Sequence, residues 1–169
     1  MLLWLVLIVA LIIIDQRGGL LVKGSNDYQV YHDQQVRVVR VVDGDTIDVE
    51  IPDAVQGSSI TRIRLWGVDA PEMRNDQGTR DAWAEESRDF VLQHAGGAVV
   101  TLRLERQRLR GSYGRVLAHV DLEDGSTLNR LLLTAGLARA EERWPHSRLL
   151  SYEQAELAAR RARRGIWSE

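Results

Sequence analysis

Acidic and basic side chains suited to phosphate chemistry are concentrated between residues 43 and 72. Asp45 lies in the stretch Asp-Gly-Asp-Thr, and Asp69 and Glu72 lie in Gly-Val-Asp-Ala-Pro-Glu. Arg64 precedes the second stretch by a few residues. Carboxylate oxygens bind hard divalent cations, and a planar guanidinium forms paired hydrogen bonds with a phosphate group. These residue types predict a site where a cation and arginines neutralise a phosphodiester while a carboxylate accepts a proton from water.

A third stretch of interest, Tyr113-Gly114-Arg115, follows a basic loop further along the chain. Gly114 permits a tight turn, from which Arg115 can reach a phosphate, and planar guanidinium donors suit a phosphoryl transition state. Tyr113 could donate a hydrogen bond to a terminal phosphate or stack on a base. A structural tyrosine at the rim of a barrel would look the same.

Each of these residues also has a plainer interpretation. Asp43 and Asp45 are typical of a turn, where aspartate forms local hydrogen bonds, and we interpret Asp43 in this way. Glu72 could be a solvated loop acid, although Pro71 before it fixes the direction of the backbone. Arg62 shares a strand face with Arg64 because side chains alternate along a strand, and a surface role is favoured for Arg62.

Alternating apolar residues predict the strands that position these groups. Two β-branched stretches, 36–42 and 47–51, are joined by Asp-Gly and predict a hairpin, and a third strand covers 60–66. Further along, we expect strands at 98–105 and 115–122. Helices are expected at 79–94 with Thr79 as cap, from Ser126 or Thr127 to Gly136, and at 147–163 with Gly165 as C-cap and Trp167 packed back on the body. This order predicts an α+β fold, a five-stranded closed barrel of the oligonucleotide-binding (OB) type with three helices.

The N-terminal region has a different character. Residues 2–14 are entirely apolar, and as a helix they would span about 20 Å, short of the roughly 30 Å hydrocarbon core of a bilayer. We expect residues 1–15 to be a hydrophobic helix that serves as a membrane anchor or signal sequence, residues 16–34 to be a linker, and the domain to occupy residues 35–169. Arg17 and Lys23 would favour a cytoplasmic domain by the positive-inside rule.

Composition excludes some kinds of site. The chain of 169 residues has no cysteine, so disulfides, thiolate zinc sites and cysteine nucleophiles are excluded. The four histidines show no zinc-ligand spacing, and His119 is expected to be packed rather than catalytic. The net charge of −2 does not by itself argue for nucleic acid. Residues 15–100 are acidic and residues 101–169 are basic. The second half could face phosphate while the first half holds metal, or the difference could be a chance variation in charge along the sequence.

The motifs at 43–46, 64–72 and 113–115 occur in the order and at the spacing of the staphylococcal nuclease (thermonuclease) family, and the chain resembles that family from about residue 36 to 169. The resemblance implies an OB barrel with three helices and a Ca²⁺-dependent nuclease, Mg²⁺ being a less favoured ion. It implies cleavage of DNA and RNA, preferably single-stranded, with little sequence preference, leaving 3′-phosphate and 5′-hydroxyl ends. It also implies an exported enzyme, with its catalytic domain extracytoplasmic. We expect the chain to be a monomer.

Residue by residue, the resemblance assigns the metal to Asp45, Asp69 and the backbone carbonyl of Ala70. It assigns catalysis to Arg64, Glu72 and Arg115, with Glu72 as general base, and substrate binding to Tyr113. The chain departs from the family at three places. Ser112 replaces a basic residue, Ala70 replaces a threonine, and Glu141-Glu142-Arg143-Trp144 stands where aromatic residues hold the base. Trp144 could stack on a base, but a core position is favoured.

Two other functions remain open from the sequence. A catalytically silent OB module would bind nucleic acid without cutting it, although such a module would not need the acids and arginines retained here. A membrane-tethered interaction domain with a chance resemblance is the third possibility.

Overall fold

The structure, a computed structural model, describes residues 27–168. Five strands close into a barrel in the order β1-β2-β3-β6-β5. Their bounds are β1 Gln35–Asp43, β2 Thr46–Val49, β3 Thr61–Leu65, β5 Val99–Arg103 and β6 Val116–Asp121. Only the β3–β6 pairing is parallel. The predicted α+β fold with a five-stranded OB barrel is thus confirmed.

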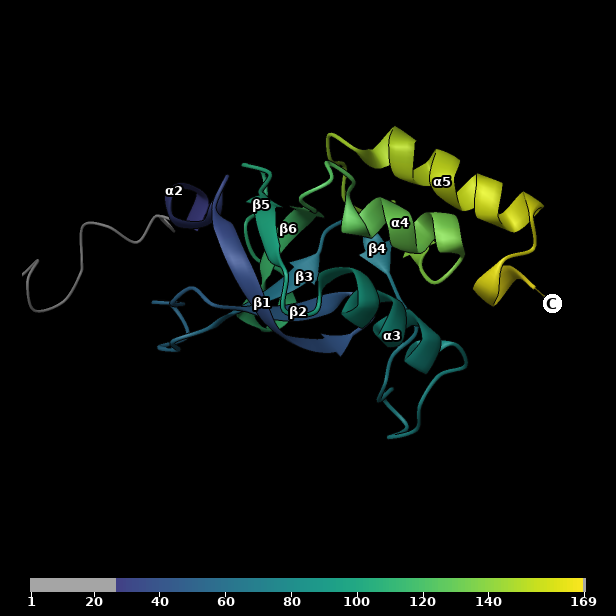
Figure 1. Ribbon diagram of the computed structural model, residues 1–169, viewed down its shortest axis with the longest axis horizontal. Helices are drawn as coiled ribbons and strands as arrows, with labels where there is room; N and C mark the ends of the chain where they lie inside the picture. The colour runs from purple at the N-terminus through teal and green to yellow at the C-terminus, as the bar shows by residue number, and fades with distance from the viewer. Residues whose placement is uncertain (1–26, 169) are drawn as a thin grey trace, which may run out of the picture.

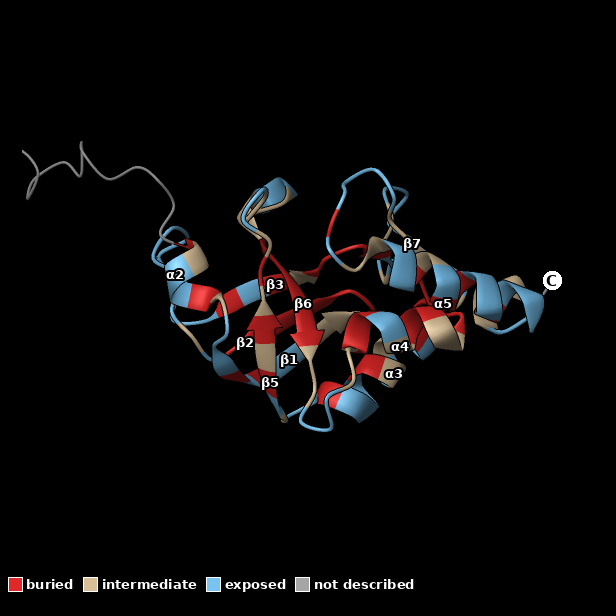
Figure 2. Ribbon diagram, turned by 90° about the horizontal axis from the view of Figure 1, so that it is seen from above, coloured by how far each residue is buried: buried red, intermediate tan, exposed pale blue. Residues whose placement is uncertain are grey.

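The strands form where apolar residues alternate, because successive side chains point to opposite faces of a strand. Val36 and Val38 of β1 are buried while Arg37 between them is exposed, and Ile63 and Leu65 of β3 are buried on either side of the partly exposed Arg64. Figure 2 shows the buried residues gathered along the barrel and on the helix faces turned toward it. The apolar interior therefore fixes which way Arg64, between two buried residues, must point.

Three helices pack at one end of the barrel, to its right in Figure 1. They are α3 Ala84–Ala95, α4 Leu128–Ala135 and α5 Leu149–Arg161. Leu128, Leu132 and Leu133 of α4 are fully buried. Gly136 ends the helix, as predicted, and this glycine adopts the left-handed conformation. A small sheet of β4 Val68–Asp69 and β7 Arg139–Ala140 was not predicted from the sequence.

A fourth helix, α2 Asp27–Tyr31, corrects the predicted linker. The Tyr31 ring is buried in the core and its hydroxyl donates to the Pro52 carbonyl at 3.0 Å. The assignment of residues 27–34 to a linker is therefore wrong, because this short polar segment is held by partners far along the chain. Residues 16–26 of that linker lie outside the described residues.

Two helix boundaries also differ from the prediction. Thr79 does not cap α3, since its hydroxyl donates to Asn75, and the helix begins at Ala84 after Trp83 with φ of 68°. Gly165 is not the C-cap of α5, which ends at Arg161, but begins the 3-10 turn η2 Gly165–Trp167. Trp167 does pack back on the body, with the Arg160 guanidinium carbon 4.1 Å from its ring centroid.

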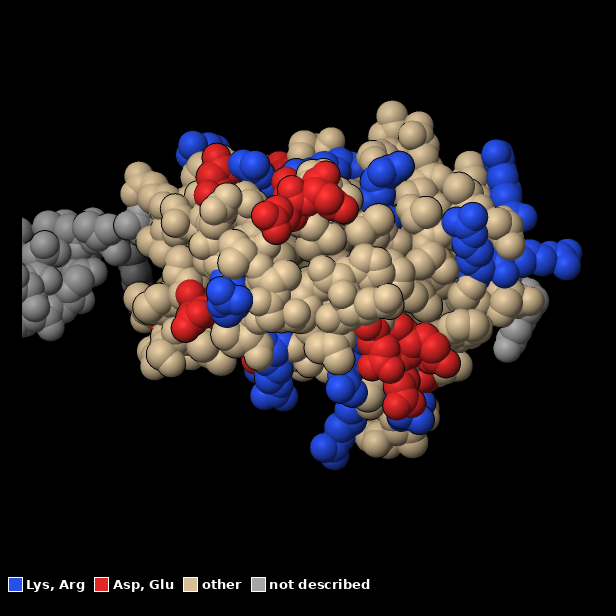
Figure 3. Space-filling view, in the orientation of Figure 1, with Lys and Arg blue, Asp and Glu red and all other residues tan. Residues whose placement is uncertain are grey.

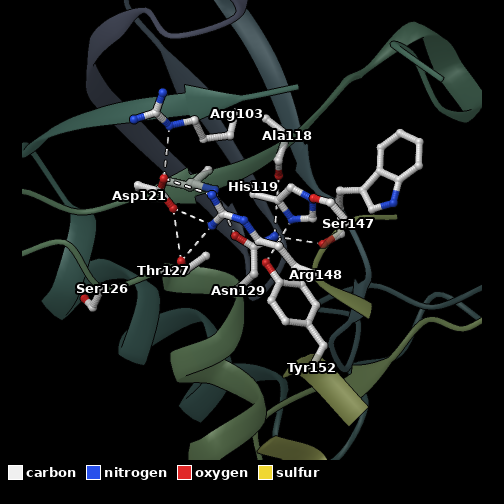
Figure 4. A network of polar contacts seen from close by, with 12 residues as sticks. Arg103, Ala118, His119, Asp121, Ser126, Thr127, Asn129, Ser147, Arg148 and Tyr152 are labelled. Atoms are coloured by element: carbon white, nitrogen blue, oxygen red, sulfur yellow. Dashed lines mark hydrogen bonds and ion pairs between the residues drawn. The ribbon is translucent and has the colours of Figure 1, made fainter. Parts of the chain in front are cut away.

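A polar network joins the barrel to α5 (Figure 4). Arg148, just before the helix, donates to Asp121 of β6 at 2.5 and 3.0 Å, and Arg103 of β5 donates to the same carboxylate at 3.1 Å. His119 is buried and shares a hydrogen bond with the Tyr152 hydroxyl at 2.8 Å, so it is packed as predicted. The last helix is thus tied to the strand that begins just after Arg115.

The predicted hydrophobic helix, residues 1–15, lies outside the described residues. Within residues 27–168, none of the helices combines the length and apolar character needed to cross a membrane.

Candidate active site

The β1–β2 turn carries Asp45 to the inner side of the barrel rim. The Asp45 amide donates to Asp43 Oδ1 at 3.1 Å, which is the turn role predicted for Asp43. Asp45 itself is only 1 % exposed. Its carboxylate accepts a hydrogen bond from the Ala70 amide at 2.9 Å. The hairpin and the segment after β4 are therefore joined at this carboxylate.

Arg64 lies between two carboxylates. Its Nη1 is paired with Asp45 Oδ2, and its Nη2 donates to Asp69 Oδ1 at 2.8 Å. The β2–β3 register places Arg64 opposite Thr46, and the β4–β7 pairing sets Asp69 opposite Arg139. Burial lowers the pKa of Arg64, an effect that the charge of Asp69 opposes. One guanidinium thus brings Asp45 and Asp69 to the same place.

Arg115 approaches the same cluster from the turn before β6. Its Nη1 donates to Thr46 Oγ1 at 3.3 Å, and that hydroxyl donates to Asp45 Oδ1 at 3.0 Å. The Arg115 Nε is buried without a hydrogen-bond partner among the described residues. Two arginines therefore lie at one rim of the barrel, and one N–H donor of Arg115 forms no hydrogen bond with the described residues.

Tyr113 stands out from the turn. It is 92 % exposed, with φ of 62°, and the Arg115 guanidinium carbon lies 5.8 Å from its ring centroid. This exposure excludes the alternative of a structural tyrosine packed at the barrel rim.

Glu72 lies in a cleft of about 420 Å³ that is also lined by Asp69 and Ala70. Its backbone is clamped, because the Glu72 amide donates to Asp81 Oδ2 and the Asp81 amide donates to the Glu72 carbonyl, both at 3.0 Å. Desolvation, and then the negative charges of Asp43 and Asp69, raise the pKa of Glu72. Glu72 therefore shares its electrostatic environment with the Arg64 cluster.

The donors at this rim, carboxylate and carbonyl oxygens, are of the type that a hard cation binds. Asp45 and Asp69 offer only oxygen ligands, and both already face one positive group, the Arg64 guanidinium. No group of three or more acidic or histidine side chains within residues 27–168 is arranged to hold a metal ion. Two carboxylates with a backbone carbonyl still suit Ca²⁺, which completes its coordination with water.

A narrower groove of about 150 Å³ adjoins Arg64 and Arg115. Trp144 lines it and is 49 % exposed, so its predicted core position is wrong. The Arg108 guanidinium carbon lies 3.9 Å from the Trp144 ring centroid. Arg108 therefore brings a cation to the groove that Ser112 lines, where the family often has a basic residue. The sequence shows that this loop is basic, but it does not predict that Arg108 stacks on Trp144.

Arg62 does not join the cluster. Its guanidinium forms two hydrogen bonds with Asp48, at 2.7 and 3.0 Å, and its side chain is exposed, which agrees with the surface role favoured for it. On the face shown in Figure 3, acidic side chains gather over α3 with arginines nearby, so both charge signs occur on this face.

An OB barrel with carboxylates and arginines at one rim is of a class whose residue types suit binding and hydrolysis of phosphate esters. The family model for staphylococcal nuclease homologues matches residues 62–169. The chain is 36 % identical to an uncharacterized endonuclease of Escherichia coli, over 79 % of this chain and 76 % of that one. It is 33 % identical to the thermonuclease of Staphylococcus hyicus, over 81 % and 78 %, and 29 % identical to the micrococcal nuclease of Shigella flexneri, over 78 % and 72 %.

The chain belongs to the staphylococcal nuclease family and is a nuclease. The matched region, residues 62–169, contains Arg64, Asp69, Glu72, Tyr113 and Arg115.

Proposed function

We propose that the chain is a Ca²⁺-dependent endonuclease that hydrolyses DNA and RNA, preferably single-stranded, with little sequence preference. The observation that carries this proposal is the Arg64 guanidinium set between the Asp45 and Asp69 carboxylates, with Arg115 joined to Asp45 through Thr46. Groups far apart in the sequence thus converge on one place at the barrel rim.

In this proposal, Asp45, Asp69 and the Ala70 carbonyl hold the ion. When bound, Ca²⁺ would supply positive charge against the phosphate and orient water there. Arg64 binds the phosphate, which replaces one of its two carboxylate partners. Its burial makes each remaining hydrogen bond stronger than it would be in water.

Glu72 acts as general base. Its carboxylate takes a proton from the attacking water while the water oxygen bonds to phosphorus. The bond from phosphorus to the 5′ oxygen breaks, that oxygen takes a proton from solvent water, and the products are a 3′-phosphate and a 5′-hydroxyl. Protonated Glu72 then releases its proton to solvent. Arg115 stabilises the charge that develops on the phosphoryl oxygens, because planar guanidinium donors suit that charge. Tyr113 contacts the substrate next to the reacting phosphate, at a base or at a terminal phosphate.

We also propose that the chain acts as a monomer and that residues 2–14 anchor it to a membrane or direct its export, with the catalytic domain extracytoplasmic. The apolar sequence of these residues supports the anchor, and membrane flotation before and after their removal would test it.

The test is to incubate the purified full-length chain and its Glu72→Gln variant with denatured DNA and with RNA. Each reaction is run with Ca²⁺, with Mg²⁺ and with chelator, and product ends are identified by their response to phosphatase and kinase. We expect wild-type cleavage only with divalent ion and a rate lower by about two to three decades in the variant. Intact substrate that is retained in a gel shift would instead indicate a silent binding module. Full activity of Glu72→Gln would remove Glu72 from the mechanism.

A further inference from the structure

A second cleft of about 420 Å³ opens beside Arg115. It lies between the 52–60 loop, the end of β1 and the turn that contains Tyr113 and Gly114. Thr46 and Arg115 line it as well as belonging to the candidate active site. Whatever occupies this cleft is therefore contiguous with a phosphate bound at the two arginines.

Two charged side chains of the cleft, Arg62 and Asp53, are already paired within the protein, and Asp43 adds a carboxyl group to the lining. Arg62 lines the cleft, but its charge is matched by the two hydrogen bonds to Asp48. Asp53 lines it too, and its carboxylate is bound by Arg110 at 2.8 and 2.9 Å. The remaining loop side chains that reach the cleft are neutral, and include Gln56, Ser58 and Ile60. A base and its sugar fit this lining better than a second phosphate does.

One arginine holds the walls of the cleft together. Arg110 donates to Asp53 of the loop, to the Gly114 carbonyl of the turn at 2.6 Å, and to Asp27 of α2 at 2.7 and 3.1 Å. The loop is further pinned by hydrogen bonds from the Val55 and Gln56 amides to Asp53 Oδ1. A cleft braced in this way exists before any ligand arrives, which reduces the entropy lost on binding.

Tyr113 presents an aromatic face at the edge of the cleft. Its φ of 62° and ψ of 18° place a non-glycine residue in the left-handed region, which is uncommon and costs free energy. The side chain is nevertheless almost fully exposed rather than packed. An aromatic ring held in such a conformation at the mouth of this cleft is suited to stacking on a base.

We propose that this cleft holds the base and sugar of a nucleotide directly adjoining the phosphate bound by Arg64 and Arg115. Gln56 and Ile60 contact the base, and Tyr113 stacks at the edge of the cleft. This inference rests on the proposed nuclease function and adds a binding subsite to it, formed by the 52–60 loop.

The test uses single-stranded tetranucleotides with one phosphodiester, the other linkages being uncharged methylphosphonates. Three substrates are compared: one with all bases, one abasic on the 5′ side of the phosphodiester and one abasic on its 3′ side. Each is cleaved, with Ca²⁺, by full-length wild type, by Gln56→Ala, by Gln56→Ala/Ile60→Ala and by the control Val55→Ala. Val55 is in the same loop and is exposed outside this cleft.

We expect wild type to cleave one abasic substrate about tenfold more slowly than the complete one, the scale of losing one stacked base. That ratio should fall toward one in the double variant, fall partly in Gln56→Ala and be retained in Val55→Ala. Equal wild-type rates on all three substrates would overturn the subsite. A ratio that survives in the double variant would place the base elsewhere and also overturn it. Failure of wild type to cleave any substrate, denatured DNA included, would be the separate failure of the proposed function.

Discussion

Arg64 and Arg115 stand at the same rim but are held by different partners. The Arg64 side chain pairs with the buried carboxylate of Asp45 and with Asp69. Arg115 donates only to the Thr46 hydroxyl among the described groups. Both are proposed to bind phosphate, so loss of either should slow catalysis. Only the loss of Arg64 leaves a buried carboxylate without its counter-charge, which is costly in a protein interior.

We therefore predict that Arg64→Gln and Arg115→Gln each lower kcat/KM by about two to three decades. In the presence of chelator, Arg64→Gln should also lower the free energy of unfolding by roughly 3 kcal/mol, and Arg115→Gln by much less. Added Ca²⁺ should restore much of the stability of Arg64→Gln, because a cation again faces Asp45. Urea unfolding with and without Ca²⁺ measures this, and equal stability of the two variants would contradict it.

At the scale of elements, hydrogen bonds join the two ends of the loop 72–81, and its first residue is Glu72, the proposed general base. The Asp81 carboxylate accepts two hydrogen bonds, from the Glu72 amide at 3.0 Å and from Asn75 Nδ2 at 2.8 Å. These bonds lower the pKa of Asp81, the contact with Asn75 having the larger effect. An asparagine at this position would have only one acceptor oxygen for two donors. The direction of the Glu72 backbone thus depends on a charged side chain nine positions later.

Asp81→Asn should lower kcat about ten- to a hundredfold with little change in KM, because a small displacement of a catalytic group is costly. Asp76→Asn, an exposed change in the same loop, serves as the control and should leave kcat unaltered. The decisive measurement is a double-mutant cycle. If Asp81 acts through Glu72, then Asp81→Asn has no further effect in the Glu72→Gln background. Additive losses would mean that Asp81 acts independently of Glu72.

Local patterns in the sequence account for much of this architecture. Alternation of apolar residues predicts the barrel strands, and Asp-Gly predicts the hairpin that buries Asp45. The motifs therefore allowed Asp45, Arg64 and Asp69 to be expected at one rim. What could not be predicted depends on partners distant in sequence. Arg110, for example, is one arginine in a basic stretch until folding places it against Asp27, 83 positions away.

The same limit applies to the aromatic residues. Trp144 is large and apolar, so burial was the reasonable expectation. In the structure it is covered on one side by Arg108, from the loop between β5 and β6, and remains half exposed beside the groove. The amino-acid sequence around Trp144 does not distinguish a buried ring from a half-exposed one, because the difference depends on which segment of the folded chain packs against the ring.

At the scale of the whole molecule, buried His119 links the barrel to the last helix. Glu105, which follows β5, lies 3.3 Å from its Nε2, and Tyr152 of α5 lies 2.8 Å from its Nδ1. His146 and Arg148, on the segment before α5, are also close to the ring. Burial, and then the positive charge of Arg148, lower the pKa of His119 to about 4. The folded state therefore keeps this imidazole neutral under conditions in which the unfolded chain protonates it.

This difference gives stability a defined pH dependence. Between its ordinary pKa of 6.5 and about 4, His119 binds more protons in the unfolded chain than in the folded one, so stability falls as the pH falls through that window. The loss is at most roughly 3 kcal/mol. Glu105, whose pKa is lowered to about 2 chiefly by hydrogen bonds from Ser147 that outweigh its burial, loses its contribution at lower pH, from its ordinary value of 4.5 downward.

We predict that the free energy of unfolding, measured with urea at intervals from pH 7 to pH 4.5, declines less steeply in His119→Gln than in wild type. Glutamine retains a hydrogen-bonding side chain but does not titrate, so the acid-dependent loss due to His119 disappears while that of His146, whose pKa is also lowered chiefly by burial, remains. His94→Gln, at an exposed position on α3, is the control and should follow the wild-type slope. Equal slopes in wild type and His119→Gln would show that the buried imidazole does not couple protons to folding.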